Sequence, residues 1–520
     1  MQSAEGDGDR TRTGKPVLLI NPRTGAGRNA GLPLSLVHLG AALEGRWPWR
    51  IADGNREPEL VRIALGRLAA RDHAMVGVTV MPGPQVATAI EVSAAIRRRF
   101  PALPIVWGGY FPTLYPNAAL NAGYVDYLVR GQGEATLLEL LAAVPAGAGG
   151  AGPSLAAIAG LSWKDAGRLV HNPERPLIPP QALPELPYHQ IEDLPAYLKP
   201  SFLGQRTAVY QAALGCRYRC TFCGVVSMWN GKTALEPADR MRLALGTLRD
   251  RWGADAVQFF DHNFFDKEES SLPMLEALGT LNMPYWCYAR ADTLAGFSAA
   301  TWEKVRRSRL RMAYVGAEAA SDWALARMRK GTKAEQTIEV ARRCRENGVI
   351  PEFSFVLGGP EEPEAEIETT FEFIRRLKTL SPEAEIILYF YSPTPQRSRA
   401  PVERQAPGAR LPVLGSYGPG GPPLPATPEE WTEPRWVRWV CHEDAPWLTP
   451  RVRRRVKDFA RVLACRFPTA QDYRLPLAAR LALRGLASWR YATRLYDHPW
   501  ELRLARRLVR LREPKRESLL

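Results

Sequence analysis

The chain has 520 residues, of which 46% are hydrophobic and 24% charged, as in an ordinary globular protein large enough for two to four domains. No run of 18 apolar residues predicts a membrane-spanning helix, and the first fifteen residues lack the apolar core of a signal peptide. The net charge of +15 is concentrated in residues 451–520, which hold 19 Lys and Arg against 6 Asp and Glu. Such a segment suits an anionic partner, either a membrane surface, a nucleic acid or an acidic substrate.

The first part of the chain alternates between strands and helices. Residues 1–15 are polar and predict a disordered tail. Residues 16–144 contain apolar strand segments at 17–21, 75–80, 105–107 and 124–129, with helical segments such as 34–43 and 84–100 between them. This alternation predicts a parallel, doubly wound, Rossmann-like α/β sheet. Its ligand should lie beyond the carboxyl ends of the strands, where the glycine turns occur.

A second alternating series follows a connector. Residues 145–205 begin with a Gly- and Pro-rich linker and continue as a strand pair and an irregular, proline-rich stretch. Residues 206–400 then contain six strand candidates, at 208–214, 256–260, 285–289, 312–316, 352–357 and 385–391. Six βα units are fewer than the eight of a closed barrel, so the sequence predicts an open, partial (βα)6 barrel with its chemistry at the C-terminal ends of the strands.

The last part of the chain is predicted to be helical and basic. Residues 401–428 are rich in Pro and Gly and predict an irregular loop, and residues 429–520 predict a helical domain. The segments 451–464 and 501–511 place apolar residues every three or four positions with arginines between them. Peripheral docking on an anionic membrane is one interpretation of these helices. Packing on the barrel with an exposed charged face is the other.

Three cysteines carry the strongest chemical signal. Cys216, Cys220 and Cys223 form a C-x3-C-x2-C pattern directly after the first strand of the second series. Three thiolates can hold three irons of a [4Fe–4S] cube, which leaves one iron open for another ligand. A structural zinc site is the alternative, but such sites use four closed ligands, and no neighbouring Cys or His has the paired spacing to complete one. The remaining cysteines predict reduced thiols and a cytoplasmic location rather than a disulfide framework.

The cysteine spacing, with Phe222 before the third cysteine, resembles the signature of radical S-adenosylmethionine (SAM) enzymes. Further strand-end motifs match that barrel, namely F-F-D-H-N-F-F at 259–265, V-G-A-E-A at 315–319, R-K-G-T at 329–332 and V-L-G-G-P-E-E-P at 356–363. The resemblance implies that SAM is contacted by Phe222, Asp261, Arg290, Glu318, Gly358 and Gly359. A salt bridge at the barrel rim is the alternative role for Asp261 or Arg290, and a hydrogen-bonded rim histidine is the interpretation of His262.

The N-terminal series resembles the cobalamin-binding domain that precedes many such barrels. The matching motifs include V-L-L-I-N-P, V-T-V-M-P-G-P, V-W-G-G-Y-F-P-T and V-R-G-Q-G-E-A-T. The resemblance implies cobalamin contacts at Gly108, Gly109, Gly131, Gly133 and Glu134. The D-x-H-x-x-G motif that supplies a histidine to cobalt is absent, so the lower cobalt ligand is unassigned. The run N-P-R-T-G-A-G at 21–27 lacks the ending of a phosphate-binding P-loop and predicts a loop beside the corrin instead.

The two resemblances together cover roughly residues 16–400 and imply three cofactors: a [4Fe–4S] cluster, SAM and cobalamin. They imply generation of a 5′-deoxyadenosyl radical and, as the commonest outcome, methyl transfer to an unactivated carbon. Relatives that oxidise or cyclise without transferring a methyl group remain an alternative, and a non-catalytic iron–sulfur or cobalamin sensor is a further one. A methylthiotransferase is disfavoured because no cysteine precedes Cys216. No catalytic side chain is assigned.

The implied partners are a small-molecule substrate and an electron donor such as flavodoxin or ferredoxin. The basic, tryptophan-rich C-terminal region favours a hydrophobic substrate of the lipid, isoprenoid or tetrapyrrole kind. The predicted location is therefore the cytoplasm, and the basic C-terminal region predicts peripheral contact with a membrane. A nucleic acid is not favoured as partner.

Overall fold

The computed structural model describes residues 14–24, 31–144, 153–359, 362, 364–392, 424–444, 448–469 and 476–508. The chain divides into two compact units, each described by itself. The first comprises Met1–Tyr197, Gly224–Ala234 and Pro395–Val440, and the second comprises Leu198–Cys223, Leu235–Thr394 and Cys441–Leu520. Residues 1–13 of the predicted tail at 1–15, the start of the linker at 145–205 and most of the loop at 401–428 lie outside the described residues.

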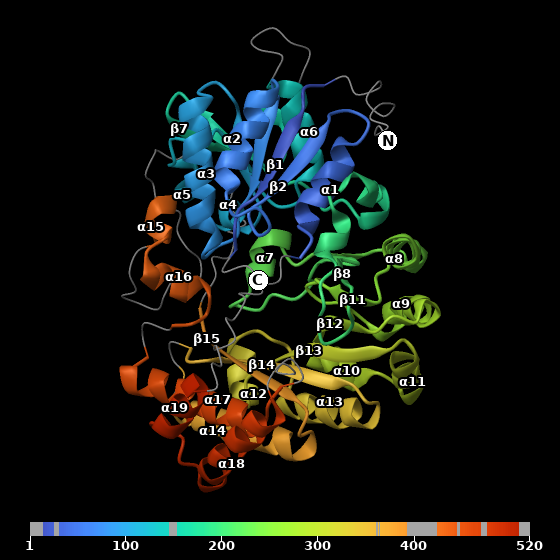
Figure 1. Cartoon of the computed structure of the whole chain (residues 1–520), viewed down its shortest axis with the longest axis vertical. Coiled ribbons are helices and arrows are strands. Elements are labelled where there is room, and N and C mark those ends of the chain that lie inside the picture. Colours follow the sequence, from blue (N-terminus) through green and yellow to red (C-terminus); the bar gives the residue numbers. More distant parts are fainter. Residues whose placement is uncertain are drawn as a thin grey trace. The chain divides into compact units, whose positions relative to one another are not determined.

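The first unit is built on a seven-stranded sheet with the order β2-β1-β3-β4-β5-β6-β7 (Figure 1). Strands β1 to β5 pair in parallel, and β6 and β7 add an antiparallel hairpin at one edge. The strands are β1 (Val17–Asn21), β2 (Trp49–Asp53), β3 (Met75–Thr79), β4 (Ile105–Gly108), β5 (Tyr127–Val129), β6 (Leu161–Asp165) and β7 (Arg168–His171). The doubly wound α/β fold is confirmed, and β2 is a strand that the sequence pattern did not predict.

The helices of the first unit come between these strands and from two later parts of the chain. They are α1 (Leu34–Leu43), α2 (Leu60–Ala70), α3 (Gln85–Arg99), α4 (Tyr110–Leu114), α5 (Pro116–Leu120), α6 (Glu134–Ala143), α7 (Gly224–Trp229), α15 (Pro428–Trp431) and α16 (Pro434–Val440). The buried Trp431 of α15 lies against Tyr115, with ring centroids 4.1 Å apart, and meets Phe111 edge-on. Aromatic burial of this kind holds α15 in the first unit.

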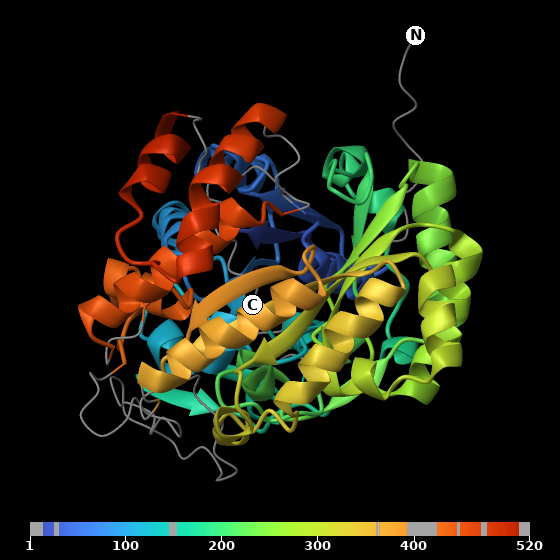
Figure 2. The same cartoon turned by 90° about the horizontal axis from the view of Figure 1, so that it is seen from below.

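The second unit contains a six-stranded, all-parallel sheet with the order β15-β14-β13-β12-β11-β8. Its strands are β8 (Thr207–Tyr210), β11 (Ala256–Phe259), β12 (Tyr285–Arg290), β13 (Leu310–Glu318), β14 (Ile350–Leu357) and β15 (Glu385–Phe390). Helices alternate with them as α8 (Ala238–Trp252), α9 (Glu268–Leu281), α10 (Ala291–Gly296), α11 (Ala299–Arg307), α12 (Asp322–Arg327), α13 (Ala334–Glu346) and α14 (Glu364–Leu380), seen in green to orange in Figure 2. The predicted partial barrel of six βα units is confirmed.

Three basic helices complete the second unit: α17 (Pro450–Arg466), α18 (Leu477–Thr493) and α19 (Trp500–Leu508). The buried ring of Phe459 on α17 stacks on Phe371 of α14, with centroids 3.9 Å apart and planes 11° apart. The packing interpretation of segment 451–464 is therefore confirmed. Helices of the predicted region 429–520 are thus shared between the two units. Among the described residues, no helix is long and apolar enough to cross a bilayer.

Candidate active site

The cysteine loop follows the short strand β9 (Ala213–Gly215), in the second unit. The Cys223 N–H donates to the Cys220 carbonyl oxygen at 3.3 Å, so the last two cysteines lie on one tight turn. Between them, the Thr221 N–H donates to the Met328 carbonyl at 3.0 Å, and the Tyr391 hydroxyl donates to the Thr221 hydroxyl at 3.1 Å. These bonds tie the loop to the end of α12 (Asp322–Arg327) and to the end of β15, and Phe222 packs against the apolar cluster there.

A buried arginine stands beside the cysteines. Arg290 ends β12, and its Nη1 lies 4.0 Å from the Cys220 Sγ. Its guanidinium lies over the Tyr218 ring at 3.3 Å and forms two hydrogen bonds with Asp292, at 2.9 and 3.0 Å. Burial disfavours the charge, but Asp292 and the thiol Sγ of Cys220 outweigh it, so the pKa of Arg290 is raised. The guanidinium is therefore a fixed positive charge at the cysteine loop.

A buried ion pair lies at the end of the next strand. Lys330 Nζ donates to Glu318 Oε1 at 2.7 Å, and Ser354 Oγ donates to Glu318 Oε2 at 3.3 Å. Glu318 has φ +63°, and a bulge between Gly316 and Glu318 shifts the register of β13 against β14. Burial acts against the Lys330 charge, but attraction to Glu318 and Cys220 prevails and raises the Lys330 pKa. The strained backbone at Glu318 thus directs its carboxylate toward Lys330. Lys330 lies in the motif R-K-G-T, but it was not predicted as a site residue.

The end of β11 leaves polar atoms without partners. Asp261 accepts a hydrogen bond from the Ala213 N–H through Oδ1, which anchors the strand that precedes the cysteines. Its Oδ2 is buried and has no hydrogen-bond partner among the described residues, and the same holds for both side-chain polar atoms of Asn263, which is 2% exposed. Buried polar atoms of native proteins are nearly always satisfied. A polar ligand at this strand end would satisfy them.

The turn after β14 contains Gly358, where the close packing of Leu448 leaves no room for a side chain. Gly358 has φ +76°, and a side chain there would come within 2.4 Å of Leu448, which precedes α17. The Gly359 N–H donates to Glu362 Oε2 at 2.7 Å. Burial raises the pKa of Glu362 to about 7. Local packing accounts for Gly358, so its contact with SAM, like that of Gly359, remains a prediction.

In the first unit, the predicted glycines lie at the carboxyl ends of β4 and β5. Gly109 has φ +95°, and a side chain there would come within 3.0 Å of the Val80 carbonyl at the end of β3. Gly108 and Gly131 border the same edge, and the Gly131 N–H donates to the Thr113 hydroxyl at 3.0 Å. Gly133 packs tightly against Leu39 and Val129, and Glu134 begins α6. Burial raises the Glu134 pKa, against hydrogen bonds from its own N–H and that of Gly133.

A buried polar network at the same edge was not predicted. The order 2-1-3-4-5 of the parallel strands puts the topological switch point between β1 and β3, which is where such folds bind ligands. Asn21 ends β1 and donates to Asp53 Oδ1 at 2.9 Å, and Gln85, at the start of α3, donates to Asn21 Oδ1 at 3.0 Å. Tyr197 donates to Asp53 Oδ2 at 3.0 Å. The network connects four segments; part of the run 21–27 lies outside the described residues.

The donor set in the second unit fits the predicted cluster and SAM. Three thiols lie on one loop beside two buried cations, which suits an anionic group, and unpartnered polar atoms lie at the neighbouring strand end. In the described ranges, no three Cys, His, Asp or Glu side chains converge on a single metal-ion position. A cubane cluster does not require such convergence, because each cysteine binds a different iron.

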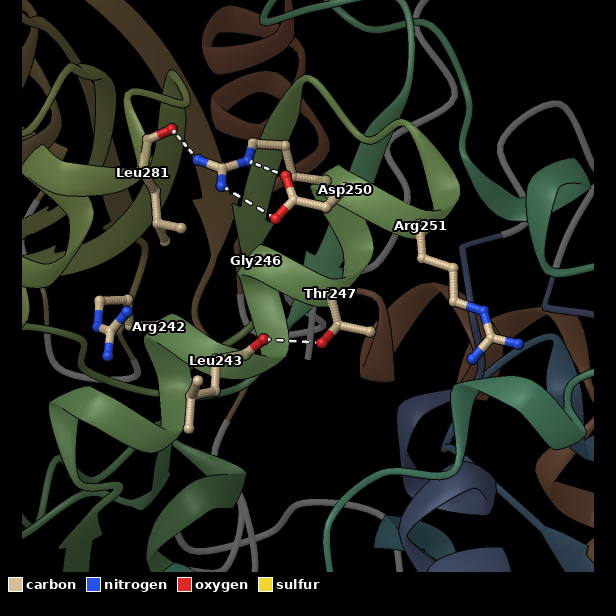
Figure 3. Close-up of a pocket in the computed structure, with 8 residues that line it drawn as sticks. Arg242, Leu243, Gly246, Thr247, Asp250, Arg251 and Leu281 are labelled. Carbon is tan, nitrogen blue, oxygen red and sulfur yellow. Dashed lines mark hydrogen bonds and ion pairs between the residues drawn. The ribbon is translucent and has the colours of Figure 1, made fainter.

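One surface depression, of about 390 Å³, lies elsewhere on the second unit (Figure 3). It is lined by the outer face of α8 and the end of α9, including Leu243, Thr247, Asp250 and Leu281. These helix ends lead into the amino ends of β11 and β12, the edge opposite to the cysteine loop. The depression is therefore not part of the candidate active site.

Comparison with known families agrees with this geometry. The model of the radical SAM superfamily matches residues 210–374, and that of the B12 binding domain matches residues 26–141. Together these ranges span more than half of the chain. The chain belongs to the cobalamin-dependent radical SAM enzymes. As a member of this family it uses a [4Fe–4S] cluster, SAM and cobalamin.

Two curated relatives of this radical SAM protein are similar over much of its length. An uncharacterized methyltransferase of Pyrococcus horikoshii is 25% identical over 370 residues, which is 69% of this chain and 78% of the relative. The anaerobic magnesium-protoporphyrin IX monomethyl ester cyclase of Synechocystis is 25% identical over 308 residues, 58% of each protein. The family assignment thus comes with relatives named for two different reactions.

Solved structures of two enzymes are similar in fold to this chain. The radical SAM methyltransferase TsrM from Kitasatospora setae, with cobalamin and a [4Fe–4S] cluster bound, has a TM-score of 0.59 at 21% identity and covers 72% of each chain. OxsB with aqua-cobalamin and SAM bound has a TM-score of 0.59 at 17% identity, covering 72% of this chain and 53% of its own. These likenesses show that the chain shares the fold of both enzymes.

Proposed function

We propose that this enzyme transfers a methyl group to an unactivated carbon of a hydrophobic small molecule of the lipid, isoprenoid or tetrapyrrole kind. When bound, the cluster and SAM supply a 5′-deoxyadenosyl radical and cobalamin supplies the methyl group. The residues of the chain bind and orient these groups and exclude water from them. The observation that carries the choice of substrate is an aromatic face in the second unit.

The aromatic face consists of Phe260, Trp286, Tyr288 and Tyr314. The Tyr288 and Tyr314 rings lie 4.9 Å apart, the Trp286 and Tyr288 rings 4.6 Å, and Phe260 meets Trp286 at 6.4 Å. Tyr288 and Tyr314 are register partners on neighbouring strands, and both are only partly buried.

The aromatic face lies on the side of the sheet opposite to helix α14. Tyr314 pairs with Glu352 in the register, whereas Phe353 and Phe355 alternate with Glu352 to the other side, where Phe355 packs on Phe373 of α14. Successive side chains of a strand point to opposite faces, so the aromatic rings line the inside of the partial barrel. A surface lined by aromatic rings favours a planar or apolar substrate over a strongly polar one.

The proposed SAM contacts are at the strand ends that border this face. Arg290 and Lys330 supply positive charge for a carboxylate, and Asp261 and Asn263 supply unpartnered oxygen and nitrogen atoms for an ammonium or hydroxyl group. Phe222 supplies an apolar edge beside the cysteine loop. In the first unit, Gly108, Gly109, Gly131, Gly133 and Glu134 are proposed to face cobalamin at the carboxyl edge of the sheet.

A second candidate is a non-methylating oxidation or cyclisation on a tetrapyrrole-like substrate. The relative named as an anaerobic cyclase favours it. In both cases an external electron donor such as flavodoxin or ferredoxin would reduce the enzyme.

The experiment is anaerobic turnover of reconstituted enzyme with methyl-labelled SAM and host lipid extract. Methylation predicts S-adenosylhomocysteine and a labelled, extractable product; oxidation or cyclisation predicts 5′-deoxyadenosine without either. Tyr288→Leu should reduce labelled product and leave uncoupled 5′-deoxyadenosine formation intact, because the ring contacts the substrate and not SAM. The exposed Leu243→Gln on α8 is the control. Label confined to water-soluble products would contradict the hydrophobic substrate.

A further inference from the structure

Helix α18 has an exposed apolar stripe. Leu477 is 62% exposed, and Leu481 and Trp489 follow at helical spacing with 57% and 48% of their surface exposed. Small residues on this face are exposed as well, namely Ala478, Ala482, Gly485 and Ala492. An exposed apolar patch of this extent marks an interaction site on most proteins.

The opposite face of α18 is already packed. Leu483 and Ala487 are buried in the helix cluster with α17, and Arg490 donates hydrogen bonds to the Leu495 and Asp497 carbonyls. Tyr496, directly after the helix, meets the Phe459 ring edge-on at 4.8 Å. The helix is therefore held by its inner face, and the stripe is presented outward on a fixed support.

Helix α19 adjoins α18 in the second unit (Figure 1) and carries exposed apolar side chains of its own. Trp500 is 68% exposed and Leu504 is half exposed, while Leu502 between them is fully buried. We call Leu477, Leu481, Leu486, Trp489, Trp500 and Leu504 the α18–α19 apolar face.

The charged side chains of α18 all have one sign. The stretch 476–493 contains Arg480, Arg484 and Arg490 and no acidic residue. Arg490 is paired with Glu501, which leaves Arg480 and Arg484 beside the stripe. Apolar side chains with tryptophan, flanked by arginines, are the pattern of helices that lie in the interface of an anionic bilayer.

We propose that the α18–α19 apolar face inserts into the headgroup region of an anionic lipid surface. A second copy of the chain fits this face less well, because a two-fold contact would bring the arginines of α18 in both copies together without a carboxylate on that helix. The surface lies on other residues than those proposed for SAM or substrate. The proposal consequently holds whether the enzyme methylates, oxidises or cyclises.

The test is sedimentation of the full-length, reconstituted protein with vesicles. Binding is expected to vesicles with about one third phosphatidylserine, to weaken with salt, and to be at least tenfold weaker with phosphatidylcholine alone. The triple variant L477Q/L481Q/W489Q should lose at least tenfold in affinity for the anionic vesicles. L243Q, which alters an equally exposed leucine on α8, should bind like the parent.

Three results would overturn the proposal. They are no sedimentation of the parent with anionic vesicles at low salt, equal binding of the triple variant, or a lipid-free dimer that the triple variant abolishes. Uncoupled SAM cleavage by the triple variant should equal that of the parent, which shows that the variant is folded. This readout also separates a failure of the lipid proposal from a failure of the proposed function.

Discussion

Lys330 and Glu318 form an ion pair in which each residue is only 5% exposed, with Nζ 2.7 Å from Oε1. Glu318 was predicted to contact SAM, and the structure shows that one of its oxygens is already held by a lysine. The second oxygen accepts from Ser354. A role for Glu318 toward SAM therefore involves the pair rather than a free carboxylate.

Removal of one partner of this pair should destabilise the second unit. Lys330→Met or Glu318→Gln is expected to cost ~3–5 kcal/mol, because an uncompensated charge or polar group stays buried, while the double variant should recover much of the loss. The measurement is the thermal unfolding midpoint of each variant. Glu276→Gln, which breaks the exposed pair with Lys304, is the control and should cost less than ~1 kcal/mol. Equal costs for the buried and exposed pairs would contradict this account.

Arg290 should set the reduction potential of the cluster. Arg290→Gln removes a positive charge that lies 4.0 Å from the Cys220 sulfur, so the added electron is less stabilised and the potential should fall. The expected shift is roughly 90 to 170 mV, from an interaction of ~2–4 kcal/mol at an effective dielectric constant of about 20. A redox titration followed by electron paramagnetic resonance measures it. Arg249→Gln, on the outer face of α8, should leave the potential in place.

Asn263 should matter for SAM and not for folding. Its amide is buried without a partner, so Asn263→Leu, of similar shape, is expected to leave the unfolding midpoint unchanged or higher. The same variant should bind SAM about tenfold more weakly by equilibrium dialysis of the cluster-loaded protein. If SAM affinity is unchanged, the polar atoms at the end of β11 do not face the ligand.

Glu362 predicts a pH-dependent stability. Burial raises its pKa from 4.5 to about 7, so the folded state favours the protonated acid. Protonated Glu362 therefore adds to the free energy of unfolding. This contribution is complete below pH 4.5, the pKa in the unfolded chain, and is lost as the pH rises through about 7. Glu362→Gln keeps an acceptor for the Gly359 N–H and cannot ionise. The variant should therefore match the parent in unfolding midpoint at pH 4.5 and exceed it at pH 8; a constant difference would contradict the prediction.

Strand periodicity predicted the partial barrel well, because its buried parallel strands read as continuous apolar runs. β2 was missed, since W-R-I-A-D has charged residues at its second and last positions and lies at the sheet edge. The cysteines were predictable from local spacing alone. Lys330 was not, since its pairing with Glu318 depends on a bulge and on a turn twelve residues later. The Asn21–Asp53–Gln85–Tyr197 network includes a direct bond between residues 144 positions apart, which no local pattern reveals.

The most direct measurement is the iron and sulfide content of anaerobically purified protein, compared with Cys220→Ala. The account predicts a brown parent protein with about four irons per chain, and a variant that retains little iron and cleaves no SAM. Cys441→Ser, outside the cysteine loop, should keep both the iron and the cleavage. A colourless, iron-free parent, or a Cys220→Ala variant with full iron and turnover, would contradict it.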